Sequence, residues 1–266
     1  MKYAVNFHTL FKHMDTVDEV ILKYENDKQR AELLNFIQQK IREDLRVVIA
    51  AEQLEEIEPR DIETFKAVRD VHPNFTIRIN LGHKSLMPEL VDNDIPFFFD
   101  VFVDSWDMLN GMIQYGVSDV YIVNEFAFYL PQIKTKCGNE IKIRVFPNVS
   151  QSTDKLHVLP TATSFFIRPE DISFYEEYVD VCEFFGPVDR NEVLYKIYTS
   201  GKWIGNLKEL IIGLKEDIPN ASIVPYFGQR RAICKKFCVN GKCNLCSQII
   251  QLANSLQENG LEVRND

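Results

Sequence analysis

Short apolar runs that recur roughly every 20 to 25 residues constrain this chain more than any other feature. Several consist almost wholly of apolar residues, as "PFFFDVFV" does, and such runs are typical of strands that are covered on both faces. Nine such runs predict strands at 2–7, 19–24, 46–51, 75–80, 96–103, 119–124, 141–146, 164–169 and 181–186. A chain of 266 residues is long enough to enclose them in one large domain.

The segments between these runs predict helices, at 27–44, 59–71 and 105–116. In the last, Ser105 is suited to cap the amino end and Gly116 to end the helix. Alternating strands and helices indicate βαβ units in a mainly parallel sheet, and about eight units make a (β/α)8 barrel of the TIM type. We expect that barrel, in regular or irregular form. A doubly wound open sheet is the alternative, but no glycine-rich phosphate loop follows any strand.

Nine candidate strands exceed the eight that a barrel needs, so one of them is expected to be peripheral or wrongly assigned. The run at 19–24 is the most doubtful, because Thr16 and Glu19 have the spacing of a helix capping box. After Gly186 the chain is expected to be helical, with one more strand at 222–228 and a terminal helix at 247–260. We therefore expect a barrel over residues 1–228, with residues 229–266 packed on it.

Four of the six cysteines lie within thirteen residues near the end of the sequence, at Cys234, Cys238, Cys243 and Cys246. Between the second and third, "NG" favours a tight turn that would bring the flanking thiols together. Four thiolates satisfy either a tetrahedral zinc ion or an iron–sulfur cluster, and the spacing does not separate the two. Reduced thiols without metal are the third interpretation. Cys137 and Cys182 are expected to be structural.

Five basic residues surround the cysteine cluster, with no acidic residue among them: Arg230, Arg231, Lys235, Lys236 and Lys242. They are suited to contact RNA or a protein partner, or they form a solvated loop. The net charge of -9 argues against broad, nonspecific binding to nucleic acid or to an anionic membrane. No apolar run resembles a signal peptide or a membrane span, so a cytoplasmic location is expected.

Polar residues at the ends of the predicted strands are the candidates for a substrate site, because barrel enzymes act at that end of their strands. The candidates are Asn6, His8, Glu52, Asn80, Asp100, Asp104, Asn124, Glu125, Asn148, Gln151, Arg168, Glu170 and Glu183. From these we select Glu125, Arg168 and Asn148 as candidate catalytic residues. The alternative is that such residues cap the helices that follow.

Residues of about 100–190 resemble the collagenase-like peptidase family, the thirty-second family of peptidases whose mechanism is unassigned. The resemblance lies in "GVSDVYIVNEFAFYLPQIK", "IKIRVFPNVSQS" and "SFFIRPEDISFYEEYVDVCEFFG", and in the later cysteines. It implies a barrel-like fold, four cysteines that hold an iron–sulfur centre, and oxygen-independent hydroxylation of RNA bases or quinone precursors. The cysteines of the family are spread more widely than the four here.

Two functions are therefore open at this stage. One is an enzyme that modifies RNA or a small polar substrate with the help of a metal centre. The other is a non-enzymatic barrel in which zinc pins the terminal helix and the basic residues bind a partner. Peptidase activity is a third hypothesis, although no Gly-x-Ser-x-Gly or His-Glu-x-x-His motif is present.

Overall fold

The computed structural model describes residues 2–6, 17–123, 129–148, 167–186, 188–205 and 207–210. These residues form a mixed α/β fold around one sheet. The strands are β1 (Lys2–Asn6), β2 (Glu19–Lys23), β3 (Arg46–Ala50), β4 (Phe75–Ile79), β5 (Phe97–Phe99), β6 (Phe102–Val103), β7 (Asp119–Ile122), β8 (Lys142–Val145) and β9 (Val181–Glu183).

All described strand pairs are parallel, in the order β5-β4-β3-β2-β1-β9-β8-β7-β6. The two outermost strands, β5 and β6, are separated by only Asp100 and Val101. The amide of Ser118, just before β7, donates a 2.7 Å hydrogen bond to the carbonyl of Phe97 in β5. One short stretch of chain thus contacts both ends of the sheet, which is curled into a barrel-like form.

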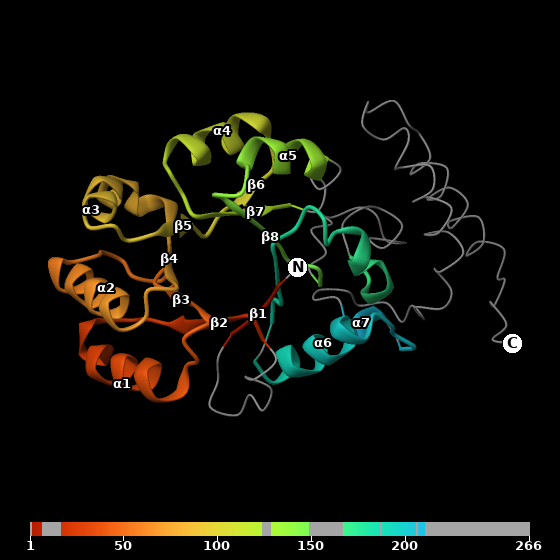
Figure 1. Ribbon diagram of the computed structural model, residues 1–266, viewed down its shortest axis with the longest axis horizontal. Helices are drawn as coiled ribbons and strands as arrows, with labels where there is room; N and C mark the ends of the chain where they lie inside the picture. Colours follow the sequence, from red (N-terminus) through yellow and green to blue (C-terminus); the bar gives the residue numbers. More distant parts are fainter. Residues whose placement is uncertain are drawn as a thin grey trace, which may run out of the picture.

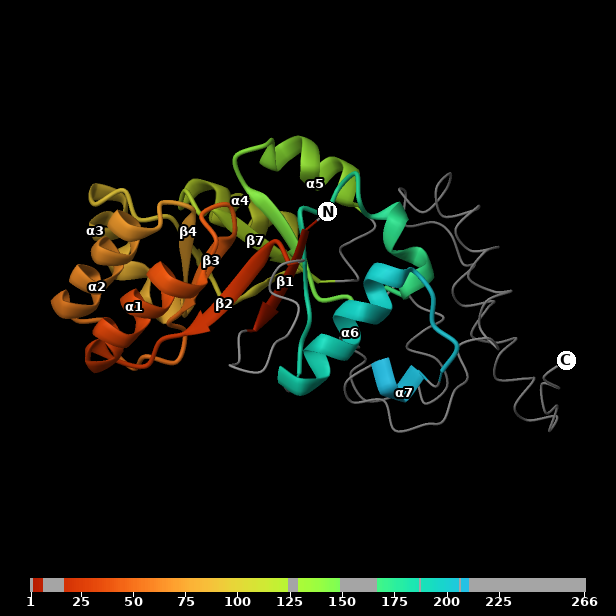
Figure 2. The same cartoon turned by 60° about the horizontal axis from the view of Figure 1, so that its bottom comes forward.

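Helices surround the curled sheet (Figure 1). They are η1 (Asp27–Gln29), α1 (Arg30–Lys40), α2 (Pro59–Val71), η2 (Leu81–Leu86), α3 (Met87–Asp92), α4 (Trp106–Gln114), α5 (Leu130–Cys137), η4 (Pro169–Phe174), α6 (Val188–Ser200) and α7 (Leu207–Leu210). The turned view shows α6 beside β1 (Figure 2), where Tyr3 packs edge-on against Tyr195. Within the described residues, no helix is both long and apolar enough to cross a membrane.

Most of the predicted elements are confirmed. The doubtful run at 19–24 is strand β2, and its Val20, Ile21 and Leu22 are buried, as a central strand requires. Helix α2 covers 59–71 as predicted, and Pro59 occupies its first turn. Helix α4 follows Ser105, whose side chain makes no capping hydrogen bond. Gly116, just after this helix, has the positive φ of 69° that suits glycine.

Two strand predictions need correction. The run at 96–103 is broken into β5 and β6. The run at 164–169 is not a strand in its described part, because Ile167 and Arg168 pair with no strand and Pro169 begins η4. Proline has no amide hydrogen for a strand ladder and is well placed in the first turn of a helix. The rest of that run, the predicted strand at 222–228 and the predicted terminal helix lie outside the described residues.

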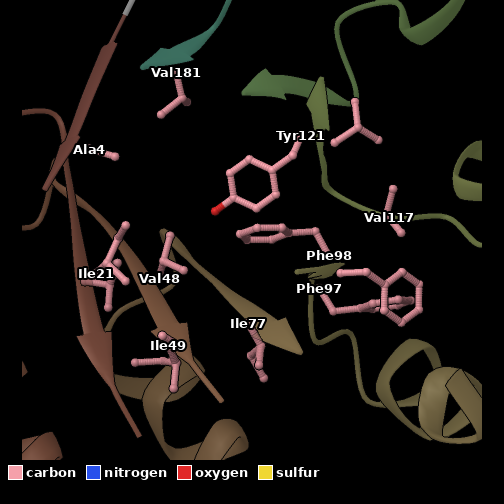
Figure 3. Packing of buried hydrophobic residues seen from close by; sticks show 14 of the residues in the cluster. Ala4, Ile21, Val48, Ile49, Ile77, Phe97, Phe98, Val117, Tyr121 and Val181 are labelled. Atoms are coloured by element: carbon pink, nitrogen blue, oxygen red, sulfur yellow. The ribbon is translucent and has the colours of Figure 1, made fainter. Parts of the chain in front are cut away.

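Apolar side chains cover the outer face of the sheet and part of its inner face. On the outer face, Phe97 and Phe99 contact each other edge-on, and Phe99 reaches Tyr115 beyond the end of α4. On the inner face, the rings of Phe98 in β5 and Tyr121 in β7 lie 5.6 Å apart, where the two ends of the sheet come together (Figure 3). Alternation along a strand sends successive side chains to opposite faces, so Phe98 points inward while its neighbours point toward the helices.

Candidate functional site

Six charged residues lie inside the curled sheet, although barrel interiors are usually filled by branched apolar side chains. Each comes from a different strand, and each is at most 8% exposed. They are three acids and three arginines: Glu19, Asp119 and Glu183, with Arg46, Arg78 and Arg144. Burying a charge is costly unless it is paired, so the contacts among these groups decide whether the fold tolerates them.

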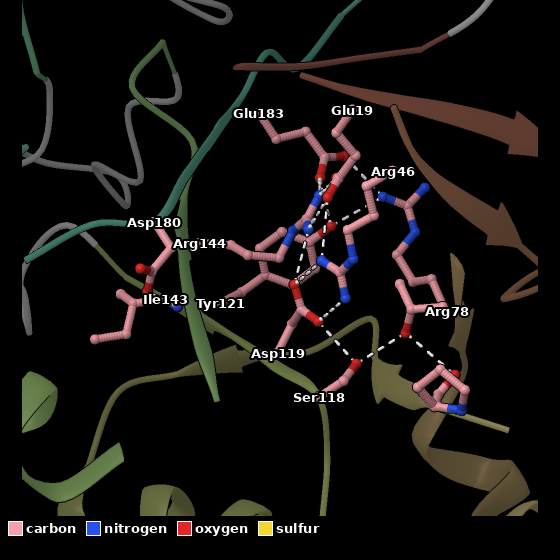
Figure 4. Close-up of polar contacts among 12 residues, drawn as sticks. Glu19, Arg46, Arg78, Ser118, Asp119, Tyr121, Ile143, Arg144, Asp180 and Glu183 are labelled. Carbon is pink, nitrogen blue, oxygen red and sulfur yellow. Dashed lines mark hydrogen bonds and ion pairs between the residues drawn. The ribbon is translucent and has the colours of Figure 1, made fainter. Parts of the chain in front are cut away.

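Glu19, Arg46 and Asp119 begin their strands and meet there, and Arg144 reaches them from the third residue of β8 (Figure 4). Arg46 binds both carboxylate oxygens of Asp119, at 2.7 and 2.6 Å, and reaches Glu19 at 3.1 Å. Arg144 bridges the same two acids, with 2.9 Å to Asp119 and a contact with each oxygen of Glu19. Burial alone would raise the pKa of Asp119, but the charges of Arg46 and Arg144 outweigh it and hold that pKa below its ordinary value.

The remaining charges meet nearer the carboxyl ends of the strands. Glu183, the last residue of β9, accepts hydrogen bonds from Arg78 at 2.7 Å, Arg144 at 3.0 Å and the Tyr121 hydroxyl at 2.6 Å. Arg78 also donates to Glu52 at 2.9 Å. Burial opposes ionisation of Glu183, but Arg78 and Arg144 hold its pKa below the usual range. Glu183 is therefore a carboxylate at neutral pH.

The strand register brings a further acid to this position. Ala50 pairs with Arg78, which pairs with Phe98, so Glu52 and Asp100 lie two residues beyond at one level of the sheet. Asp100 is exposed, and no described residue forms a hydrogen bond or ion pair with its carboxylate. The surrounding protein removes part of the water around this carboxylate and so raises the pKa of Asp100; Arg78 opposes this shift, and Glu52 and Glu183 add to it. We call Glu52, Arg78, Asp100, Tyr121 and Glu183 the edge cluster.

Aromatic rings continue from the edge cluster across the neighbouring strands. Tyr121 stacks on Phe146 at 4.9 Å and lies 5.8 Å from Phe102. Phe146 in turn meets Phe185 edge-on at 5.8 Å. Phe102 and Phe185 are 37% and 51% exposed, which is unusual for large apolar side chains beside a core. We call Phe102, Tyr121, Phe146 and Phe185 the aromatic row.

The three residues selected from the sequence as catalytic have different positions. The Asn148 side chain donates to the carbonyl of Phe185 at 2.7 Å and accepts from its amide at 2.9 Å. It therefore extends the pairing of β8 with β9 beyond the ends of the strands. Arg168 is buried 4.0 Å from Glu170, whose carboxylate accepts from the Trp203 amide. Glu125 lies outside the described residues, and the catalytic role of all three remains a prediction.

Among the other strand-end candidates, Asn80 has the capping role that was the alternative reading. Its side chain accepts a 2.8 Å hydrogen bond from the amide of Gly82 at the start of η2. Glu52, Asp100 and Glu183 lie close together at the carboxyl edge, a convergence that the sequence did not predict. Arg78 and Tyr121 were not among the candidates, because these were chosen mainly at the carboxyl ends of the predicted strands. Their signal is a charged or hydroxyl-bearing residue inside an otherwise apolar strand, as in "FTIRI" and "DVYI".

The predicted metal ligands Cys234, Cys238, Cys243 and Cys246 lie outside the described residues, as do the basic residues around them. Within the described ranges, no three His, Cys, Asp or Glu side chains are grouped to hold a metal ion. Cys137 and Cys182 are buried and not disulfide-bonded, in keeping with the structural role expected of them. Burial raises the pKa of Cys137 to about 11 and also raises that of Cys182, so both are protonated at neutral pH.

Comparison with known proteins gives a partial relationship. No family model matches the chain. A Methanocaldococcus jannaschii protein described as an uncharacterized protease is 31% identical over 100 residues. The match covers 33% of this chain and 28% of that relative, so the chain matches well under half of the relative's length. This similarity is consistent with the partial resemblance to the collagenase-like peptidase family.

Proposed function

We propose that this protein is an enzyme that modifies its substrate at the edge cluster, on a complete (β/α)8 barrel of the TIM type. The observation that carries the proposal is the convergence of Glu52, Arg78, Glu183 and Asp100 at the carboxyl end of a parallel, barrel-like sheet. Enzymes of this architecture act at that end of their strands. Perturbed carboxyl groups that gather there are typical of sites for proton transfer.

The acids of the edge cluster are of two kinds, those that pair with Arg78 and one that does not. Arg78 binds Glu52 and Glu183, and this pairing favours the ionised form of Glu183. Asp100 has no such partner among the described residues, and its raised pKa brings it closer to the working pH of a general acid or base. Asp100 therefore exchanges the proton with the substrate, while Arg78 and Tyr121 keep the neighbouring carboxylates in place.

The four cysteines outside the described residues supply the donor set for a metal centre. Cys234, Cys238, Cys243 and Cys246 match in number and chemistry the thiolates that an iron–sulfur cluster requires. When bound, such a cluster supplies single electrons to a reaction. We propose an iron–sulfur centre at these cysteines, in line with the family resemblance, with zinc as the alternative.

The reaction that we propose is hydroxylation of an RNA base or a quinone precursor, the activity that the family resemblance implies: a C–H bond becomes C–OH, and an organic oxygen donor, bound as co-substrate, supplies the oxygen atom and is itself reduced by two electrons. The aromatic row offers such a planar ring a surface for stacking next to Asp100. The five basic residues beside the cysteines are proposed to contact RNA or a protein partner. Peptidase activity is the second candidate, favoured by the protease description of the partly similar relative.

Product analysis in cells tests the proposal. Cells that lack the gene are complemented with the wild-type protein, with Asp100→Asn, or with Glu63→Gln as a control on the outer helix α2. Nucleosides and quinones are then compared by mass spectrometry. A compound with one added oxygen should depend on the gene, disappear with Asp100→Asn and persist with Glu63→Gln. Identical products in all strains would contradict the proposal, and peptides lost only with Asp100→Asn would favour the peptidase.

A further inference from the structure

The edge cluster carries more negative than positive charge. The three interior arginines are balanced by Glu19, Asp119 and Glu183. Glu52 and Asp100 add two further carboxyl groups at the carboxyl edge. The nearby cation Lys23 is exposed and pairs with Glu25 at 2.6 Å. The described part of the edge is therefore short of positive charge.

One oxygen of Glu52 lacks a donor as well. Its Oε1 accepts from Arg78, whereas its Oε2 is buried and has no hydrogen-bond partner within the described ranges. A buried carboxylate oxygen without a donor is costly, so a ligand that brings an N–H group to it gains free energy. Asp100 is the second acceptor at the same level of the sheet.

Aromatic rings flank this pair of acceptors. Phe98 and Phe102, two residues to either side of Asp100, both lie within 6 Å of the Tyr121 ring, at 5.6 and 5.8 Å. Asp100 is thus held beside the aromatic row. Two of the rings, Phe98 and Tyr121, already contact a cation inside the sheet: the Arg144 guanidinium lies 5.0 Å from the Phe98 ring and 5.5 Å from the Tyr121 ring.

From these observations we propose that the edge cluster binds a small organic ammonium ion. The ammonium group bonds to Glu52 and Asp100, and the apolar body of the ligand lies on the exposed rings of Phe102 and Phe185. Charge complementarity favours this occupant over a neutral or anionic one of the same shape. The inference rests on the proposed function only in taking the edge cluster as the ligand site, and the ammonium ion is a further ligand of that site, distinct from the RNA base or quinone precursor.

Binding of benzylamine, which is protonated at pH 7, tests this inference on the full-length protein. Calorimetric titration compares it with benzyl alcohol and benzoate, which have a similar ring but no positive charge. We expect benzylamine to bind about tenfold more tightly than benzyl alcohol, as a charge-assisted hydrogen bond would allow. Asp100→Asn and Glu52→Gln should each weaken benzylamine binding by about fivefold or more.

Two controls separate charge from ring contact and from general effects. Glu63→Gln removes one exposed carboxylate of the outer helix α2, which pairs with Lys66, and should leave benzylamine binding unchanged. Phe185→Ala should weaken benzylamine and benzyl alcohol alike. Equal binding of benzylamine and benzyl alcohol, or equal losses with Asp100→Asn and Glu63→Gln, would overturn the inference. Because no turnover is measured, such a failure is distinct from failure of the product analysis above.

Discussion

The hydroxyl of Tyr121 donates a 2.6 Å hydrogen bond to Glu183 and accepts one of 2.9 Å from Arg78. Burial raises the pKa of Tyr121 well above its ordinary value, so the hydroxyl stays protonated and remains a donor. The same ring belongs to the aromatic row through its stacking on Phe146. Tyr121 therefore connects the charged and the aromatic parts of the candidate site.

Replacing Tyr121 with phenylalanine keeps the ring and removes only this hydroxyl. We expect the free energy of unfolding to fall by about 1 to 3 kcal/mol, because a buried carboxylate loses a donor. Urea denaturation measures the change. Tyr115→Phe is the matched control, since Tyr115 is partly exposed and packs on Phe99 through its ring. Equal effects of the two substitutions would contradict the role assigned to the Tyr121 hydroxyl.

Arg144 is fully buried and contacts Glu19, Asp119 and Glu183, so its loss removes one of the two arginines that pair with each of these carboxylates. We predict that Arg144→Met lowers the free energy of unfolding by about 3 to 5 kcal/mol. Arg42→Met, which removes an exposed pair with Asp44, should cost less than about 1 kcal/mol. Urea denaturation of both variants measures these losses. A loss below about 1 kcal/mol for Arg144→Met would contradict the stabilising role of the buried charge network.

Asp100 gives a pH dependence of defined sign. Its pKa is raised in the folded protein, so the folded state binds the proton more tightly than the unfolded chain does. The resulting stability is present below the unfolded pKa and is lost as the pH rises through the folded pKa. Asp100→Asn should therefore raise the melting temperature at pH 7, with a smaller difference near pH 3, where the acid is protonated. A lower melting temperature at pH 7 would argue against this.

Asn148 makes two hydrogen bonds to the backbone of Phe185, one through its side-chain nitrogen and one through its side-chain oxygen. Asn148→Ala should lower the free energy of unfolding by about 1 to 3 kcal/mol, since it leaves backbone groups without partners. Its effect on product formation, measured at a temperature where the variant is folded, tests the catalytic role predicted from the sequence. Loss of product in the folded variant would support that role, whereas normal product would restrict Asn148 to a structural one.

The described strands were largely predictable, because buried parallel strands consist of nearly continuous runs of apolar residues. Even the doubtful 19–24 run has this signature. The charged interior was not predicted. Arg46 and Asp119 are partners across 73 residues of sequence, and only closure of the curled sheet brings them together. A single charge within an apolar strand indicates a buried partner but does not say on which strand the partner lies.

The candidate site was predictable in part, because the positions of the strands indicate which polar residues lie at the strand ends. Glu52, Asp100 and Glu183 were expected at the ends of strands, and the register places the first two at one level. The break between β5 and β6, which leaves Asp100 exposed, has no clear signal in "FFFDVFV". The sequence around Asn148 also does not show that its side chain pairs with the backbone of Phe185.

We propose that an iron–sulfur centre at the four cysteines serves an enzyme site on this sheet. Metal analysis and a visible absorption spectrum of the protein purified without oxygen test this most directly. We expect iron and sulfide with a broad band at roughly 400 nm, typical of protein-bound iron–sulfur clusters. Cys243→Ser should abolish the band. One zinc ion per chain and a colourless protein would contradict the redox enzyme and favour a zinc-stabilised interaction module.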